Sequence, residues 1–133
     1  YLKTIKVLVR LALAPFAVFL NDDNQNYVEP DLSVICNPSQ IDDKGCHGAP
    51  DWIIEIVSPS SERMDYVVKT FKYRTAGVRE YWVIDKTLQK VTVFDFENDN
   101  MFEYDFTQKI PVLIYDGELE LIYPDLFSYD LGG

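Results

Sequence analysis

The sequence predicts an α+β domain, and three observations support this prediction. The chain has 133 residues, which is the length of one ordinary domain. Its hydrophobic fraction of 47%, with 14% aromatic residues, is enough to build a packed core. Strand-like segments lie on both sides of one helix-like segment, and no internal repeat is present. We therefore expect residues 1–133 to form a single domain.

The first third of the chain is predicted to contain strands, a turn and a loop. Val7–Leu20 is rich in Val, Leu, Phe and Ala, and the proline within it favours two short strands or one interrupted edge strand. The polar run 21–26 predicts a turn, and the alternating pattern of 27–36 predicts a strand. Residues 37–50 contain prolines and glycines, so we expect a long loop there.

A strand buried on both faces is predicted at Asp51–Val57, because the run DWIIEIV is apolar apart from its two acids. Glu55 lies inside this run. A carboxylate in such a place is costly unless a metal, a cation or hydrogen bonds compensate for its burial. Glu55 is therefore a strong candidate for a functional residue.

One helix follows, starting at Ser60 or Ser61, either of which can cap its free amide groups. Gly77 predicts that the helix ends at about Ala76. Three apolar residues of this helix are expected to cover the sheet: Val67, Val68 and Phe71. After the helix, period-two patterns predict a β-hairpin over EYWVID and VTVFDF. Further strands are predicted at 101–106, 112–115 and 119–123.

Charge and composition exclude several functions. A net charge of −10 argues against indiscriminate binding to DNA or anionic membranes, so a polyanion would need a basic patch or a bound cation. His47 is the single histidine, which makes a zinc site very unfavourable. Cys36 and Cys46 could pair, but two cysteines are typical of a reduced cytoplasmic protein. The longest apolar run, Val7–Leu20, is too short to span a membrane.

The candidate site residues are acids on two predicted strands and a lysine on the helix. Asp31 follows a proline, and Glu29 shares its face because side chains alternate along a strand. A solvated strand face explains Glu29 alone better, and an exposed lysine paired with Asp65 would explain Lys69 alone. Together with Glu55 the set fits phosphodiester hydrolysis, because Mg²⁺ prefers carboxylate oxygens and an ammonium can stabilise developing negative charge.

Two runs, EPDLSVIC (29–36) and GAPDWIIEIVSPSSERMDYVVKTFKYRTAGVREYWVIDKTLQKVTVF (48–94), resemble the Uma-type putative restriction endonuclease domains of the PD-(D/E)XK nuclease superfamily. The resemblance implies a restriction endonuclease-like core, with a mixed sheet flanked by helices. It also implies DNA as the substrate and a divalent ion, Mg²⁺ or Mn²⁺. The implied site consists of Asp31 and Glu55 as metal ligands, Glu29 as an auxiliary acid, the Ile56 carbonyl as a further ligand, and Lys69 as the catalytic lysine.

The sequence departs from the superfamily pattern at Val57, where the lysine usually stands two residues after the second acid. The resemblance implies that this lysine has moved to the helix, at Lys69. It also implies a further N-terminal helical segment that this chain lacks. The sequence thus leaves two hypotheses: a metal-dependent endonuclease acting as a homodimer, or a non-catalytic module that keeps the nuclease fold and binds a protein or nucleic acid.

Overall fold

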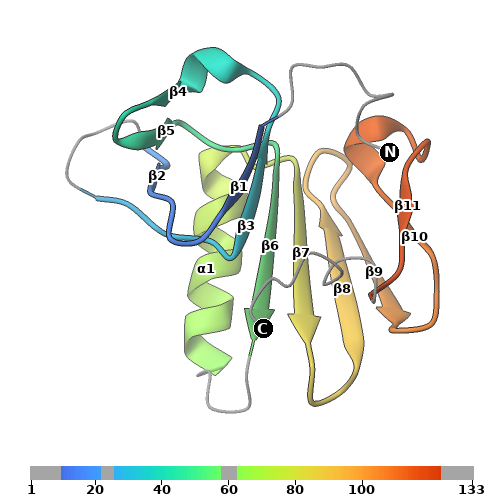
Figure 1. Ribbon diagram of the computed structural model, residues 1–133. Coiled ribbons are helices and arrows are strands. Elements are labelled where there is room, and N and C mark those ends of the chain that lie inside the picture. Colours follow the sequence, from blue (N-terminus) through green and yellow to red (C-terminus); the bar gives the residue numbers. More distant parts are fainter. Residues whose placement is uncertain (1–9, 22–25, 58–62, 124–133) are drawn as a thin grey trace.

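The computed structural model describes residues 10–21, 26–57 and 63–123. Its central sheet contains β1 (Arg10–Leu13), β3 (Leu32–Ile35), β6 (Trp52–Val57), β7 (Glu80–Asp85), β8 (Lys90–Asp95) and β9 (Asn100–Asp105). Their order is β1-β3-β6-β7-β8-β9 (Figure 1). β6 and β7 are parallel, and all other neighbours are antiparallel. The predicted α+β class with a central mixed sheet is confirmed.

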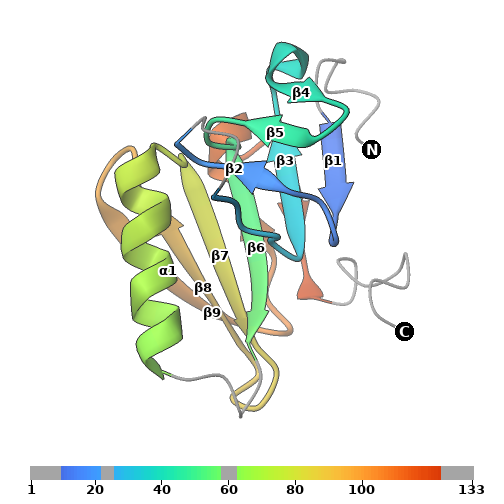
Figure 2. The same cartoon turned by 90° about the vertical axis from the view of Figure 1, so that its left-hand side faces the viewer.

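The two faces of this sheet are covered differently (Figure 2). Helix α1 (Arg63–Ala76) lies on one face, where Tyr73 packs into a cluster with Ile53 and Tyr81. The other face is covered by the segment β10 (Ile110–Pro111), η3 (Leu113–Tyr115) and β11 (Glu120–Leu121). Within the described residues α1 is the one α-helix. The flanking helices that were expected are therefore represented by a single helix, on one face of the sheet.

A second, three-stranded sheet lies where a long loop was expected. It has the order β2-β5-β4, with β2 (Val18–Phe19), β4 (Ile41–Asp42) and β5 (Gly45–His47). The loop prediction for 37–50 was therefore wrong, because pairing with the distant β2 orders this segment. Gly45 is required here: it has a φ of +142°, and a Cβ on it would lie 2.2 Å from the Ala17 carbonyl oxygen.

The strands of the first third are shorter than predicted. Val7–Leu20 does contain two short strands, β1 and β2, within its described part. The strand predicted at 27–36 is reduced to β3, and all its residues are buried. Ser33, on the side expected to be polar, is 1% accessible. Ile35 lies on the same face and packs with Val18 and Cys46 of the small sheet, so this face is covered as well.

Helix α1 ends at Ala76 as predicted, and Gly77 follows with a φ of +101°. Its start at 60–61 lies outside the described residues. The predicted packing face was wrong, because Val67, Val68 and Phe71 are exposed, and Phe71 is 70% accessible. The helix is rotated so that Tyr73 faces the sheet with no accessible surface.

The hairpin β7–β8 is confirmed in register from Glu80↔Asp95 to Asp85↔Lys90. The strand predicted at 101–106 corresponds to β9, and the one at 119–123 to the shorter β11. The strand predicted at 112–115 was wrong: it is a 3₁₀ turn, which Asp116 ends with a φ of 56°. No helix in the described part is long and apolar enough to cross a membrane.

Candidate active site

Asp31 and Glu55 face each other where the ladder between β3 and β6 ends. The last backbone pair is Leu32↔Ile54, so Asp31 stands opposite Glu55 in the same antiparallel register. Beyond this pair, the two strands are joined by hydrogen bonds between carboxylates and backbone N–H groups. Asp31 N–H donates to Glu55 Oε1 at 3.2 Å, and Ile56 N–H donates to Asp31 Oδ2 at 2.7 Å. Two carboxylates are thereby held at one end of the sheet.

Helix α1 contributes two groups to the other oxygen of Glu55. Tyr73 Oη donates a hydrogen bond to Glu55 Oε2 at 2.8 Å, and Lys69 Nζ lies 3.4 Å from the same oxygen. Lys69 and Tyr73 are four residues apart, so they share one face of the helix. These contacts explain the rotation of α1, since the helix turns its tyrosine and lysine toward Glu55.

Burial dominates the electrostatics of Glu55, whose side chain is 7% accessible. Loss of solvent raises the pKa of Glu55, and the nearby charge of Asp31 raises it further. The Tyr73 hydroxyl and the Lys69 ammonium act in the opposite direction but do not cancel the effect. Burial, together with the charge of Glu55, also raises the pKa of Tyr73, which keeps its hydroxyl proton available for donation.

The other predicted site residues, Glu29 and Ile56, lie at the edge of the site formed by Asp31 and Glu55. Glu29 is exposed, and no hydrogen bond or ion pair joins it to Asp31 or Glu55 within the described residues. The N–H and C=O groups of one strand residue point to the same side. The Ile56 carbonyl therefore lies on the β3 side of β6, as its N–H does. Val57 is half-buried and packs against the cluster that contains Tyr73 and Tyr81. An apolar side chain therefore stands where the superfamily pattern has a lysine.

The donor set fits a hard divalent cation. Mg²⁺ is usually bound by one or two carboxylates, with water and substrate phosphate as its other ligands. Asp31 and Glu55 provide two carboxylates that are already side by side, and Asp31 is exposed to solvent. Within the described residues, no group of three or more His, Cys, Asp or Glu side chains could hold an ion. These residues therefore do not form an all-protein metal cage. They fit a magnesium site in which water and substrate phosphate complete the coordination.

The sequence places Tyr73 on the same helix stripe as Lys69, but its hydrogen bond to Glu55 was not predicted. Replacing Tyr73 with Phe removes the donor to Glu55 and keeps the ring. We expect Tyr73→Phe to lower the unfolding free energy by about 1–2 kcal/mol and the affinity for Mn²⁺ by about 10-fold. Urea unfolding and Mn²⁺ titration measure the two effects. Tyr27→Phe, at an exposed tyrosine, is the matched control, and equal Mn²⁺ affinities in both variants would contradict a positioning role for Tyr73.

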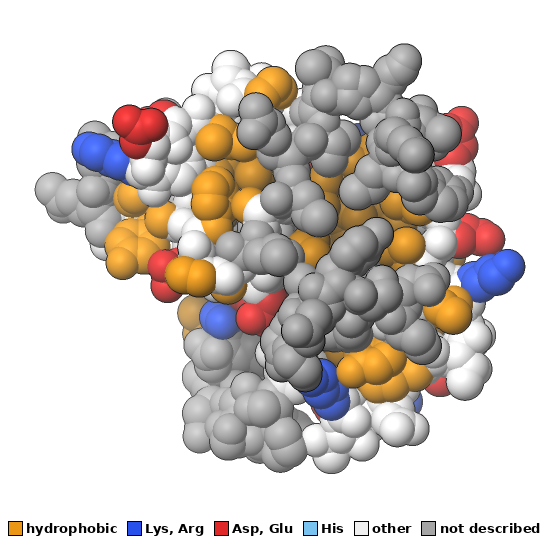
Figure 3. All heavy atoms as spheres, in the orientation of Figure 1, with side chains coloured by type: hydrophobic (Ala, Val, Ile, Leu, Met, Phe, Trp, Pro, Cys, Tyr) orange, Lys and Arg blue, Asp and Glu red, His pale blue; other side chains and the backbone are white. Residues whose placement is uncertain are grey.

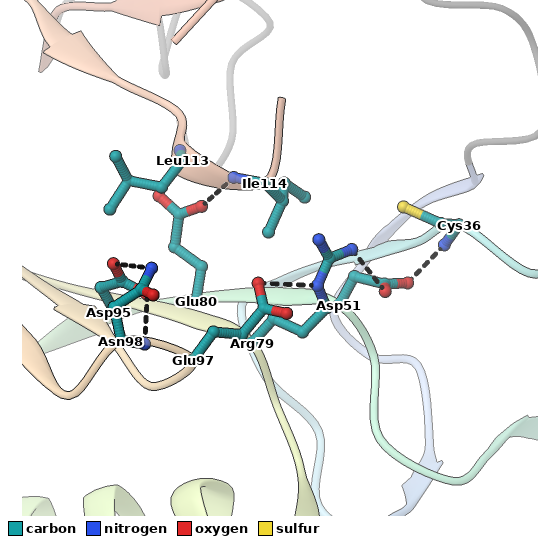
Figure 4. Close-up of polar contacts among 9 residues, drawn as sticks. All are labelled: Cys36, Asp51, Arg79, Glu80, Asp95, Glu97, Asn98, Leu113 and Ile114. Atoms are coloured by element: carbon teal, nitrogen blue, oxygen red, sulfur yellow. Dashed lines mark hydrogen bonds and ion pairs between the residues drawn. The ribbon is translucent and has the colours of Figure 1, made fainter. Parts of the chain in front are cut away.

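A second set of buried acids is structural. Glu80 is 1% accessible and accepts three hydrogen bonds, from Trp82 Nε1 at 2.7 Å, Leu113 N at 3.2 Å and Ile114 N at 2.9 Å. Figure 4 shows the contact with Ile114. Asp95 accepts two bonds from Asn98 in the β8–β9 turn. All these donors come from the protein itself, so both carboxylates connect elements of the fold.

Asp51 links three segments in the same region (Figure 4). Its carboxylate accepts from Cys36 N–H at 2.7 Å and from Arg79 Nη1 at 3.2 Å, and Arg79 Nε lies 3.1 Å from Glu97. Both cysteines are free, and burial raises the pKa of Cys36 and of Cys46 to about 11. Protonated thiols are poor nucleophiles, so this cluster does not form a cysteine active site.

Two arginines near the C-terminal end of α1 pair with acids. Arg74 pairs with Asp99, and Arg79 pairs with Asp51 and Glu97. On the face opposite α1, blue side chains are isolated among the coloured residues (Figure 3). Tyr81 and Trp82 are buried core residues, so they are not available to stack on bases. Lys69, which is 39% accessible beside Glu55, is the cation that lies at the candidate site.

Comparison with known proteins places the site in context. The family model Uma2, described as a putative restriction endonuclease, matches residues 8–128. A solved structure of a putative nuclease belonging to DUF820, from Anabaena variabilis ATCC 29413, has a TM-score of 0.69 and 26% sequence identity. The alignment covers 96% of this chain and 72% of that chain. No curated protein matches the sequence.

Proposed function

The chain belongs to the Uma2 family of putative restriction endonucleases, and on that premise we propose that it is a divalent-metal-dependent endonuclease that hydrolyses DNA. The observation that carries this proposal is the meeting of Asp31, Glu55 and Lys69 at one end of β3 and β6. An acid pair beside an ammonium is the minimal set for metal-assisted phosphodiester hydrolysis.

Asp31 and Glu55 are the residues that would hold Mg²⁺ or Mn²⁺, with the Ile56 carbonyl as a third candidate ligand and Glu29 as an auxiliary acid. When bound, the ion supplies Lewis acidity and lowers the pKa of coordinated water. The protein contributes orientation. Asp31 N–H and the Tyr73 hydroxyl hold the two oxygens of Glu55 in fixed directions.

Lys69 is the positioning cation in this proposal. Its ammonium lies beside Glu55 yet its side chain is 39% accessible, so it can reach both the carboxylate and an entering phosphate. A fixed ammonium stabilises negative charge that develops on the phosphoryl oxygens, and it loses little energy to reorganisation. This replaces the lysine that the superfamily carries at the position of Val57.

The net charge of −10 makes a metal ion more important for DNA binding. DNA repels an acidic surface, and each phosphate contact needs a local cation. A divalent ion on Asp31 and Glu55 would offset both acids and attract the scissile phosphate. Both DNA binding and DNA cleavage should therefore require the ion.

Plasmid cleavage tests the proposal. Wild-type protein should convert supercoiled plasmid to nicked or linear DNA with Mg²⁺ or Mn²⁺, and EDTA should abolish the reaction. Either ion should also raise the melting temperature of the protein, because a ligand that binds the native state stabilises it by mass action. No cleavage of any DNA, together with an unchanged melting temperature, would contradict the proposal.

A second candidate function is a non-catalytic nuclease-fold module that binds a protein or a nucleic acid. Two observations favour it: Val57 at the superfamily lysine position, and the strongly acidic surface. A folded protein that binds a partner or DNA without metal, and does not cleave, would support this alternative.

Two further parts of the proposal concern assembly and location. We expect a homodimer, because the sheet ends on an exposed edge strand, β9. We also expect a cytoplasmic location, since the free thiols Cys36 and Cys46 suit a reducing compartment.

A further inference from the structure

The outer edge of strand β9 is unpaired within the described part of the chain. β9 pairs with β8 along its whole length, from Asn100↔Asp95 to Asp105↔Lys90, and forms the end of the central sheet. It has 6 residues, whereas the opposite edge strand, β1, has 4. The free N–H and C=O groups along such an edge are a template for another strand.

β9 carries two acids, Glu103 and Asp105, but it has no lysine, proline or bulge to protect its edge. Natural edge strands carry proline, lysine or a bulge, whereas β9 reads NMFEYD and keeps a continuous register with β8. Its apolar side chains are accessible on both faces of the sheet. Met101, opposite Phe94, is 57% accessible, and Phe102, opposite Val93, is 40% accessible. The backbone and the side chains of β9 therefore both favour a partner strand.

We propose that β9 is a self-association surface, on which β9 of a second copy pairs antiparallel across a two-fold axis. An antiparallel pair of identical strands is self-complementary, so one contact covers both edges and closes the assembly. In such a pair, the exposed side chain of Phe102 can be covered by Phe102 of the partner subunit. The proposal specifies the interface of the homodimer in the proposed function, and it does not depend on nuclease activity.

Charge selects the register of this pair. Two registers pair most of the strand: one places Phe102 opposite Phe102 of the partner subunit, and the other places Glu103 opposite its own copy. Like charges directly opposite each other destabilise a sheet, whereas a cross-strand aromatic pair stabilises it. The first register is therefore favoured. In it Met101 lies opposite Glu103 of the partner subunit, which allows the methionine methylenes to cover the glutamate stem.

The proposed dimer separates the two candidate active sites. The axis would run perpendicular to the sheet, so the ends of β6 that carry Glu55 would point to opposite edges of the joined sheet. With neighbouring strands about 4.8 Å apart, the two copies of β6 lie roughly 34 Å apart across the sheet. Each site would act on its own stretch of DNA.

Disulfide crosslinking tests both the interface and its register. Opposite Cα atoms in an antiparallel pair are about 4.5–5.5 Å apart, which a disulfide can span. Under oxidation with copper phenanthroline, Phe102→Cys should form a covalent dimer, and wild-type protein controls for Cys36 and Cys46. Glu103→Cys alone should stay uncrosslinked. An equal mixture of Met101→Cys and Glu103→Cys chains should crosslink.

Light scattering of the wild type provides the independent measurement. The expected mass is twice 15.4 kDa, and Phe102→Lys, a change at a surface residue that should leave the fold intact, should reduce the mass to that of one chain. A wild-type mass of 15.4 kDa at all concentrations, or efficient crosslinking of Glu103→Cys with itself, would overturn the proposal. Neither readout requires DNA cleavage, so failure of the interface and failure of the proposed function can be told apart.

Discussion

Glu55→Gln is expected to lower the rate of metal-dependent DNA cleavage by at least about 10³-fold, which corresponds to about 4 kcal/mol of lost transition-state stabilisation. The substitution removes one of the two charges that would hold the ion and keeps the size of the side chain. Asp31→Asn should have an effect of the same order. Initial rates of plasmid nicking at saturating Mg²⁺ measure the loss.

The same variant should not lose stability in the absence of metal. Burial raises the pKa of Glu55, so the ionised form is the costly one, and a neutral amide avoids that cost. The amide oxygen of Gln can still accept from Asp31 N–H. Glu120→Gln, at an exposed position of β11, controls for the loss of a carboxylate elsewhere. A melting temperature several degrees lower in Glu55→Gln alone would mark Glu55 as chiefly a structural acceptor.

Glu80→Ala is expected to lower the unfolding free energy by about 3–5 kcal/mol, a large share of a small domain's total. The change leaves three buried donors without an acceptor: Trp82 Nε1, Leu113 N and Ile114 N. It also detaches the η3 segment from β7. Urea unfolding measures the loss, and Glu120→Ala, at an exposed position of β11, is the control. A loss below about 1 kcal/mol would contradict the connecting role of Glu80.

Glu80→Gln separates charge from hydrogen bonding. Burial raises the pKa of Glu80 above the ordinary value of 4.5, so folding favours the protonated form. The stability that this group contributes is present below pH 4.5 and is lost as pH rises through the folded-state pKa. The difference in unfolding free energy between wild type and Glu80→Gln should therefore shift in favour of the variant as pH rises. A difference that stays constant with pH would contradict this.

The sequence predicts those elements that depend on local pattern. β6 follows from an apolar run that contains one acid, Glu55; the end of α1 follows from Gly77, and the hairpin β7–β8 from period-two alternation. The small sheet β2-β5-β4 could not be predicted, because its strands are very short and gain their order from pairing across distant segments.

The candidate site also combines a residue that the local sequence singles out with residues whose positions depend on the fold. Glu55 can be singled out because an acid within a buried strand needs compensation. Its partner Asp31 depends on the register between β3 and β6, which the sequence does not specify and for which the family resemblance was needed. The rotation of α1 was missed because Val67, Val68 and Phe71 are its most apolar residues, yet the bonds of Lys69 and Tyr73 to Glu55 determine which face packs.

Glu80 was missed although a usable signal was present. The run EYWVID contains an acid at the start of an otherwise apolar strand, as DWIIEIV contains Glu55. The two carboxylates differ in their partners. Glu80 accepts from three N–H groups of the fold, whereas Glu55 lies beside a second carboxylate and a partly accessible ammonium. The surroundings of a buried acid, and not its burial alone, indicate function.

Anomalous scattering from a crystal soaked in Mn²⁺ tests the central claim most directly. The account predicts one strong peak bridging Asp31 and Glu55, about 2.1 Å from an oxygen of each, with the Lys69 ammonium still adjacent to Glu55. The peak should vanish in Glu55→Gln. A fully soaked crystal with no peak at these carboxylates, or with manganese only at other acids, would contradict the assignment of this site.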